Sequence, residues 1–250
     1  NINSPMYWGQ LFEDVSIKIY EWKFDTKIDD FGCIPHNCYS YIAASPDGIN
    51  CKRDNNRYGR MLEIKNIVNR EITGIPKMEY WIQMQLQMET CNLNECDFLE
   101  TRFIEYESST DFINDVDFSS NQTIGVNNNK FTYRGCILHF EGKNGPIYEY
   151  HKFGLTLDEI KTWENTIMNN YPECYWVQTI YWKLTEISCI LVLKNYTWFI
   201  KALPYIELIW NIIEIEKTKD YSHRAPKKRN RNDKLVSNLP VVRKCLLNID

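Results

Sequence analysis

Hydrophobic and polar residues recur with two different periods in the first 106 residues, and these periods predict alternating helices and strands. Apolar residues three or four positions apart predict a helix over residues 6–22. Residues 41–44 predict a short buried strand, and alternating apolar and polar residues predict strands over 60–67 and 96–106. The spacing of Trp81, Met84 and Met88 predicts a helix over 77–91, which follows Pro76. Residues 25–39 and 50–59 are predicted to be loops.

The second half of the chain predicts further strands and helices around this core. Residues 107–129 are polar and rich in Asn, Ser and Asp, which predicts a surface excursion, and residues 131–140 and 147–153 predict a hairpin. Thr156 and Glu159 have the spacing of a capping box, so a helix is predicted from there to residue 170. Residues 174–185 and 187–195 predict two strands joined tightly near Glu186, and residues 195–216 predict a long helix. We therefore expect a core over 1–106, an elaboration of the same domain over 107–220, and a tail over 221–250.

Composition narrows the class of protein. With 250 residues, 44% of them hydrophobic, the chain can bury a full core. No apolar run approaches the roughly 18 residues that span a bilayer, so we expect a soluble intracellular protein with no membrane partner. The nine cysteines include no CxxC pair, which favours reduced thiols over a disulfide framework. A zinc or iron–sulfur site built on Cys33, His36, Cys38 and Cys51 is an alternative, although their spacing is irregular.

Charge is distributed unevenly along the chain. Residues 221–250 contain eight Lys or Arg residues against two Asp residues, a net charge of +6, so the first 220 residues carry −10 of the total of −4. The basic tail is compatible with a nuclear signal or a nucleic-acid-binding arm, and equally with a disordered solubilising segment. An acidic body does not exclude a DNA-binding protein, because metal ligands add negative charge and phosphate contacts are local.

Two short stretches bring together the residue types that metal-dependent hydrolysis needs. Asp47 lies in the turn-forming run Ser45-Pro46-Asp47-Gly48, and Glu63 and Lys65 share one face of the predicted strand while its apolar residues face the other way. Asp47 can lie beside Glu63 if the intervening segment forms a hairpin or loop. Two carboxylates suit Mg²⁺, and a lysine can position or deprotonate a water or stabilise charge on phosphorus. The alternative is a solvated strand face with an ordinary ion pair.

The helix predicted over 77–91 carries a second candidate surface. Tyr80, Gln83 and Gln87 fall on one face, beside the apolar stripe. A tyrosine among glutamines favours contact with a polar ligand, whereas glutamines alone are usual on an exposed face. Glu13 lies at the border of the apolar stripe of the first helix, and the pattern alone predicts a surface glutamate there.

The order of these motifs resembles one family. The runs Gly9-x3-Glu13-x6-Tyr20-Glu21, Ala44-Ser45-Pro46-Asp47-Gly48, Leu62-Glu63-Ile64-Lys65 and Tyr80-x2-Gln83-x-Gln85 are similar to those of the YqaJ-type viral recombinases, the phage lambda exonuclease-like nucleases of the PD-(D/E)xK superfamily. The resemblance covers roughly residues 8–106. The aromatic spacing of 181–184 and 195–199 resembles, more weakly, the C-terminal part of YqaJ-like proteins of large DNA viruses.

The resemblance implies a fold, an activity and roles for individual residues. The implied fold is an α/β restriction-endonuclease-like core, a central mixed sheet flanked by helices. Asp47, Glu63, Glu13 and the main-chain carbonyl of Ile64 are implied as ligands of one or two Mg²⁺ or Mn²⁺ ions, and Lys65 as the catalytic lysine. Gln83 is implied to act beside the metals, and Tyr80, Gln83 and Ser45 to contact substrate.

The implied activity is hydrolysis of linear duplex DNA from a 5′ end during viral recombination, repair or genome processing. DNA is the implied substrate, and a single-strand annealing protein and a homo-oligomer are further implied partners. Two alternatives remain: a structure-specific or nicking endonuclease that uses the same site, and a non-catalytic module that binds DNA or a protein.

Overall fold

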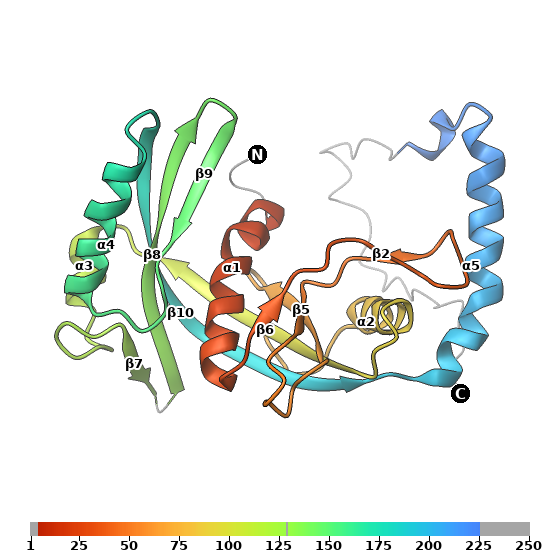
Figure 1. Cartoon of the computed structure of the whole chain (residues 1–250), viewed down its shortest axis with the longest axis horizontal. Coiled ribbons are helices and arrows are strands. Elements are labelled where there is room, and N and C mark those ends of the chain that lie inside the picture. Colours follow the sequence, from red (N-terminus) through yellow and green to blue (C-terminus); the bar gives the residue numbers. More distant parts are fainter. Residues whose placement is uncertain (1–4, 129, 226–250) are drawn as a thin grey trace, which may run out of the picture. The chain divides into compact units, whose positions relative to one another are not determined.

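The computed structural model describes residues 5–128 and 130–225, which fall into two compact units (Figure 1). The first unit extends to Lys194 and contains the sheets and the helices α1 to α4. The second begins at Asn195; its described part contains the helix α5 (Tyr196–Lys217) and the 3-10 helix η1 (Ser222–Arg224). Most of the predicted basic tail lies outside the described residues. Within the described residues, no helix has both the length and the apolarity needed to cross a bilayer.

The first unit is organised around an eight-stranded mixed sheet. Its order is β1 (Ile28–Asp29), β4 (Gly48–Asn50), β5 (Met61–Asn66), β6 (Glu95–Glu105), β10 (Tyr175–Leu193), β8 (Lys130–Gly142) and β7 (Ile124–Asn127), with β9 (Gly145–Tyr150) also paired to β8. Strands β5 and β6 are parallel and are connected by α2 (Met78–Thr90), while the other pairs are antiparallel. The predicted fold class, a central mixed sheet flanked by helices, is confirmed.

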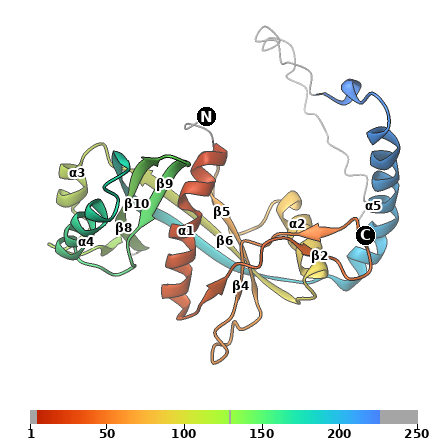
Figure 2. The ribbon, with the colours of Figure 1, turned by 45° about the horizontal axis from the view of Figure 1, so that its top comes forward.

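Helices α1 (Pro5–Phe24) and α2 cover opposite faces of the sheet because side chains alternate along β5. Leu62 and Ile64 pack with Tyr20 of α1, whereas Met61 packs with Met84 and Met88 of α2. Earlier in α1, apolar side chains pack on β6, β8 and β10 in a separate cluster. Figure 2 shows α1 running across the sheet. Glu63 and Lys65 therefore lie on the same face as Met61, the face that α2 covers.

The region predicted as a polar surface excursion, residues 107–129, includes two regular elements within its described residues, 107–128. It contains the helix α3 (Ser109–Asn114) and the strand β7. The buried rings of Phe112 and Phe118 both contact the guanidinium of Arg134, which is itself buried and donates to the Phe112 and Gln122 carbonyls. The contacts of Phe112 and Phe118 with the buried Arg134 thus hold this mostly polar segment against the rest of the unit. The helix α4 (Leu157–Asn170) begins at Thr156 with the predicted capping box.

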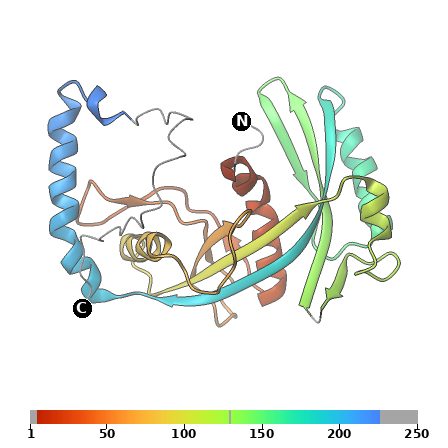
Figure 3. The same cartoon turned by 180° about the vertical axis from the view of Figure 1, so that it is seen from behind.

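The two strands predicted over 174–185 and 187–195 form one 19-residue strand, β10, so the prediction of a tight connection near Glu186 was wrong. The register of β10 with β6 shifts between Leu184 and Glu186, so the pairing is irregular there but the strand continues. The strand pairs with β8 through its first half and with β6 through its second, and Figure 3 shows the resulting curved strand. The predicted strand over 41–44 is reduced to β3 (Ala43–Ala44), which pairs with β2 (Ile34–Pro35) in a separate two-stranded sheet.

Candidate active site

Strand β5 presents Glu63 and Lys65 at the edge of the site. The Glu63 side chain is completely buried, and one of its oxygens, Oε1, accepts a bond from the ammonium of Lys65. The Lys65 side chain is 23% exposed, so its ammonium lies between the buried carboxylate and the open side of the site. Its Nζ also lies 5.2 Å from the centre of the Tyr80 ring on α2.

The neighbouring strand β4 brings Asp47 back beside Glu63. It pairs with β5 at Met61 and Leu62, and the rest of that edge of β5 has no strand partner in the part of the chain that the structure describes. Asp47 occupies the free edge, where its Oδ2 accepts a 2.6 Å hydrogen bond from the Ile64 main-chain N–H. In a strand, the N–H and C=O of one residue point to the same side, so the Ile64 carbonyl faces this edge too.

The Asp47 carboxyl is held in a setting that disfavours its charge. Burial, followed by the negative charge of Glu63, raises its pKa from 3.8 to about 7, although the bond from Ile64 acts in the opposite direction. Glu13 on α1 contributes a further repulsion of the same sign. Asp47, Glu63 and Lys65, distant in sequence, are thus brought together, and the Lys65 ammonium pairs with the Glu63 carboxylate rather than with Asp47.

Glu13 approaches the site from α1, which is tied to the end of β5 through Asn66. The Asn66 Nδ2 donates to the Gly9 carbonyl at 2.7 Å, and its Oδ1 accepts from Ser16 at 2.7 Å. Glu13 is half-buried, and burial together with the charges of Asp14 and Glu63 raises its pKa. Its side chain forms no hydrogen bond within the described residues. The structure therefore places Glu13 within electrostatic range of Glu63 and Lys65, but not in contact with them.

On α2, the side chain of Gln87 contacts the Glu63 carboxylate. Its Nε2 donates to Glu63 Oε2 at 2.9 Å and lies 3.4 Å from the main-chain oxygen of Ser45, whereas Gln83, which the resemblance implied, is partly exposed and makes no side-chain hydrogen bond within the described residues. The spacing of Tyr80, Gln83 and Gln87 placed all three on one face. It did not indicate which glutamine reaches the strand.

A buried ion pair beside Lys65 was also missed from the sequence. Glu100 on β6 is opposite Lys65 in the parallel register and is 1% exposed, and one of its oxygens accepts from the guanidinium of Arg70. The centre of the Arg70 guanidinium lies 5.5 Å from the Tyr80 ring, so Lys65 and Arg70 contact the same ring. The alternation of β6 could have shown that Glu100 shares a face with Phe98, but its partner lies 30 residues away.

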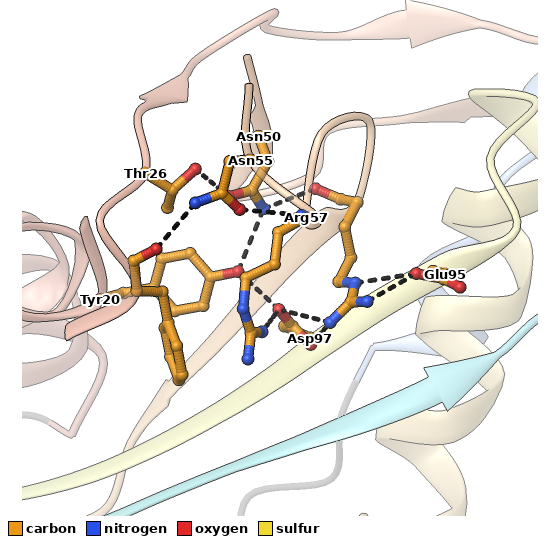
Figure 4. Close-up of polar contacts among 9 residues, drawn as sticks. Tyr20, Thr26, Asn50, Asn55, Arg57, Glu95 and Asp97 are labelled. Carbon is orange, nitrogen blue, oxygen red and sulfur yellow. Dashed lines mark hydrogen bonds and ion pairs between the residues drawn. The ribbon is translucent and has the colours of Figure 1, made fainter. Parts of the chain in front are cut away.

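A polar network on the opposite face fixes the hairpin that bears Asp47 and Glu63 (Figure 4). The buried Asp97 of β6 accepts from the hydroxyl of Tyr20 at 2.5 Å and from both Arg57 and Arg60. Asn50 at the end of β4 donates to the Tyr20 hydroxyl and to the Arg60 carbonyl. Because these bonds connect α1, β6 and both ends of the loop between β4 and β5, they restrict how the two acid-bearing segments move.

The donor set fits a hard divalent cation. Mg²⁺ retains several waters and needs only one or two carboxylates, which Asp47 and Glu63 supply next to the Ile64 carbonyl. The described residues contain no group of three or more His, Cys, Asp or Glu side chains arranged to hold a metal. Cys33, His36, Cys38 and Cys51 therefore do not form such a group, and neither does Glu13 together with Asp47 and Glu63, which leaves Asp47 and Glu63 as the candidate carboxylate ligands. Cys33 and Cys38 are exposed, and His36 Nδ1 accepts from the Cys38 N–H.

Comparison with known proteins identifies similar chains. Residues 1–94 match the family model of the YqaJ-like viral recombinase domain, which confirms the resemblance predicted from the motifs. An uncharacterised protein, R354 of Acanthamoeba polyphaga mimivirus, is 28% identical over 243 residues, which include 84% of this chain and 44% of the relative. This chain thus spans less than half the length of that curated relative.

Two solved structures also match part of the chain. The alkaline exonuclease LHK-Exo of Laribacter hongkongensis is 29% identical, with a TM-score of 0.36, over 41% of this chain and 52% of that one. LHK-Exo in complex with dAMP is 29% identical, with a TM-score of 0.34, over 39% and 50%.

Proposed function

We propose that this protein, whose residues 1–94 match the YqaJ-like viral recombinase domain, is a metal-dependent deoxyribonuclease that degrades linear duplex DNA from its ends. The observation that carries the proposal is the convergence of Asp47, Glu63 and Lys65 at the free edge of β5. The partly buried carboxyl of Asp47, whose pKa is raised, the buried carboxylate of Glu63 and the adjacent ammonium of Lys65 form a site that binds a divalent cation and then acts on a phosphate.

Each residue has a distinct task in this proposal. Asp47, Glu63 and the Ile64 carbonyl hold Mg²⁺ or Mn²⁺, with Glu13 adding negative charge from α1. A bound divalent cation supplies the positive charge that favours ionisation of the attacking water and neutralises the scissile phosphate. Lys65 orients that water or donates to a phosphate oxygen, since its ammonium is partly exposed.

Three residues on the rim of the site complete the proposed contacts. Gln83 is partly exposed on the helix that covers the site, so its amide can bind water or DNA. Tyr80 and Ser45 are proposed to contact the substrate backbone. Digestion in the 5′ to 3′ direction, an annealing protein as partner and assembly into an oligomer belong to the same proposal and rest on the family resemblance.

The test is digestion of linear duplex DNA that carries a label at either the 5′ or the 3′ end, in Mg²⁺ and in Mn²⁺. We expect early release of the 5′ label, and closed circular duplex of the same sequence should remain intact. Cleavage of the closed circular DNA would contradict the exonuclease function and would favour the alternative, an endonuclease that uses the same site.

Matched variants separate catalysis from binding in this assay. Asp47→Ala and Lys65→Ala should abolish cleavage while the protein stays folded and still binds DNA. Asp54→Ala and Lys143→Ala change the same residue types at exposed positions in loops, and they should leave cleavage unchanged. Cleavage at the wild-type rate by Asp47→Ala or Lys65→Ala would refute the proposed function, and DNA binding by a wild-type protein that never cleaves would favour the binding-module alternative.

A further inference from the structure

Three glutamines occupy alternate positions of α2, and their surroundings differ. Gln83 is partly exposed and makes no side-chain hydrogen bond within the described residues. Gln85 is 1% exposed, and its Nε2 donates to the Leu193 carbonyl at 3.0 Å, away from the carboxylates. Gln87 is 5% exposed and lies one helical turn after Gln83, on the side of the helix that faces the carboxylates. The same residue type therefore occurs in an open, a structural and a site-facing environment within a single helix.

The Gln87 amide joins the two segments that carry the acidic residues. Its Nε2 donates to Glu63 Oε2 at 2.9 Å on β5 and lies 3.4 Å from the carbonyl oxygen of Ser45, two residues before Asp47. The other Glu63 oxygen is bonded to Lys65, so both oxygens of this buried carboxylate have a fixed direction. Asp47 and Glu63 repel each other, and contacts that hold both segments in place oppose that repulsion.

The remaining polar atom of Gln87 indicates that fold stability alone does not explain this residue. Its Oε1 is buried and has no hydrogen-bond partner within the described residues. A buried carbonyl without a partner lowers stability, and an apolar side chain of similar length would avoid that penalty. The residue instead aims a donor at a carboxylate proposed to bind a metal, as groups that orient metal ligands do.

We propose that Gln87 is a positioning residue that orients Glu63 and holds the turn around Ser45 at the separation that a shared divalent cation requires. The proposal rests on the proposed function, because it concerns the same pair of carboxylates. It assigns Gln83 and Gln87 separate tasks: Gln83 is open to substrate and water, and Gln87 acts through Glu63 without touching the substrate.

The experiment measures metal binding directly, by calorimetric titration of the metal-free protein with Mn²⁺ and with Ca²⁺, and compares Gln87→Met with Gln85→Met. Both changes replace a buried glutamine of α2 by an apolar side chain of similar length. We expect Gln87→Met to weaken binding about 10- to 100-fold, the usual effect of losing a group that orients a metal ligand, and Gln85→Met to leave binding unchanged. The Mg²⁺ concentration for half-maximal cleavage should rise by the same factor in Gln87→Met only.

The outcomes distinguish this inference from the proposed function. A wild-type protein that neither binds metal nor cleaves DNA would refute the proposed function itself. A wild-type protein that does both, with equal metal affinity in Gln87→Met, would overturn the role of Gln87 alone. Gln87→Leu is a second apolar variant for the same titration. Loss of folding in both variants, seen by circular dichroism and thermal unfolding, would show that the amide serves the fold and would likewise overturn the inference.

Discussion

Replacing Asp47 by Asn should stabilise the metal-free protein above neutral pH while removing its activity. In the folded protein, burial and the charge of Glu63 raise the pKa of Asp47 from 3.8 to about 7. Between these values the folded state keeps a proton that the unfolded state has lost, so the wild-type free energy of unfolding falls as pH rises. A shift of roughly three pH units corresponds to about 4 kcal/mol, an upper value because nearby carboxylates titrate together. Asparagine keeps an oxygen that can accept the bond from the Ile64 N–H but carries no charge.

The assay is urea unfolding of both proteins in EDTA from pH 4 to pH 8.5, with Asp54→Asn as the control at an exposed carboxylate. The variant and the wild type should be equally stable near pH 4, and the variant should become progressively more stable until the difference levels off above pH 7. Mg²⁺ should then stabilise only the wild type, because it binds the charged carboxylates. A difference that does not change with pH, or that grows toward acid, would contradict the assignment of Asp47 as a destabilised carboxyl.

Three further predictions follow from other parts of the structure. Asp97→Ala removes the buried acceptor shared by Tyr20, Arg57 and Arg60 and should lower the free energy of unfolding by about 3–5 kcal/mol in urea unfolding, because Arg57 loses its carboxylate partner and Arg60 keeps only Glu95 among the described residues. An effect below about 1 kcal/mol would contradict this. Gly135→Ala should destabilise the protein by about 1–3 kcal/mol in thermal unfolding, because a Cβ at this position would lie 2.7 Å from the Trp182 ring. Gly9→Ala is the control: a Cβ there would have no atom within 4 Å, so this change should be neutral or stabilising. Ca²⁺ should bind and compete with Mg²⁺ without supporting cleavage, because its looser coordination positions the reacting groups poorly, and efficient hydrolysis in Ca²⁺ would count against the proposed mechanism.

Much of the fold could be predicted because the elements around the site carry strong local patterns. The apolar spacing of α1 and α2 and the alternation of β5 and β6 placed these four elements within one or two residues of their observed bounds. The segments predicted less well depend on distant contacts. Strand β10 continues through Glu186 because both β8 and β6 pair with it, and residues 107–128 fold around Arg134, which lies outside that segment.

In the candidate site, too, the residues placed by local sequence patterns could be predicted, and those placed by contacts distant in sequence could not. The pattern of β5 was enough to place Glu63 and Lys65 on one face, and the turn residues around Asp47 were enough to suggest its return to that strand. The partner of Glu63 on α2 could not be predicted, because the rotation of a helix about its axis is set by packing, here by Met84 and Met88 against the sheet. Gln87 then reaches the carboxylate and Gln83 stays open.

The shortness of β4 is what makes the site possible. If β4 continued to pair with β5 beyond Leu62, it would bind the main-chain N–H and C=O of Ile64. In the structure, the Ile64 N–H donates to Asp47 instead, and its carbonyl faces the site. Unpaired strand edges invite pairing with other chains, and proteins usually cover them or place charges along them. Here the charge placed at the edge is Asp47, and burial together with the charge of Glu63 raises its pKa, so its ionised form is disfavoured there. The same feature that disfavours this charge in the metal-free protein therefore provides a carboxylate and a carbonyl oxygen side by side, which is the arrangement a divalent cation stabilises.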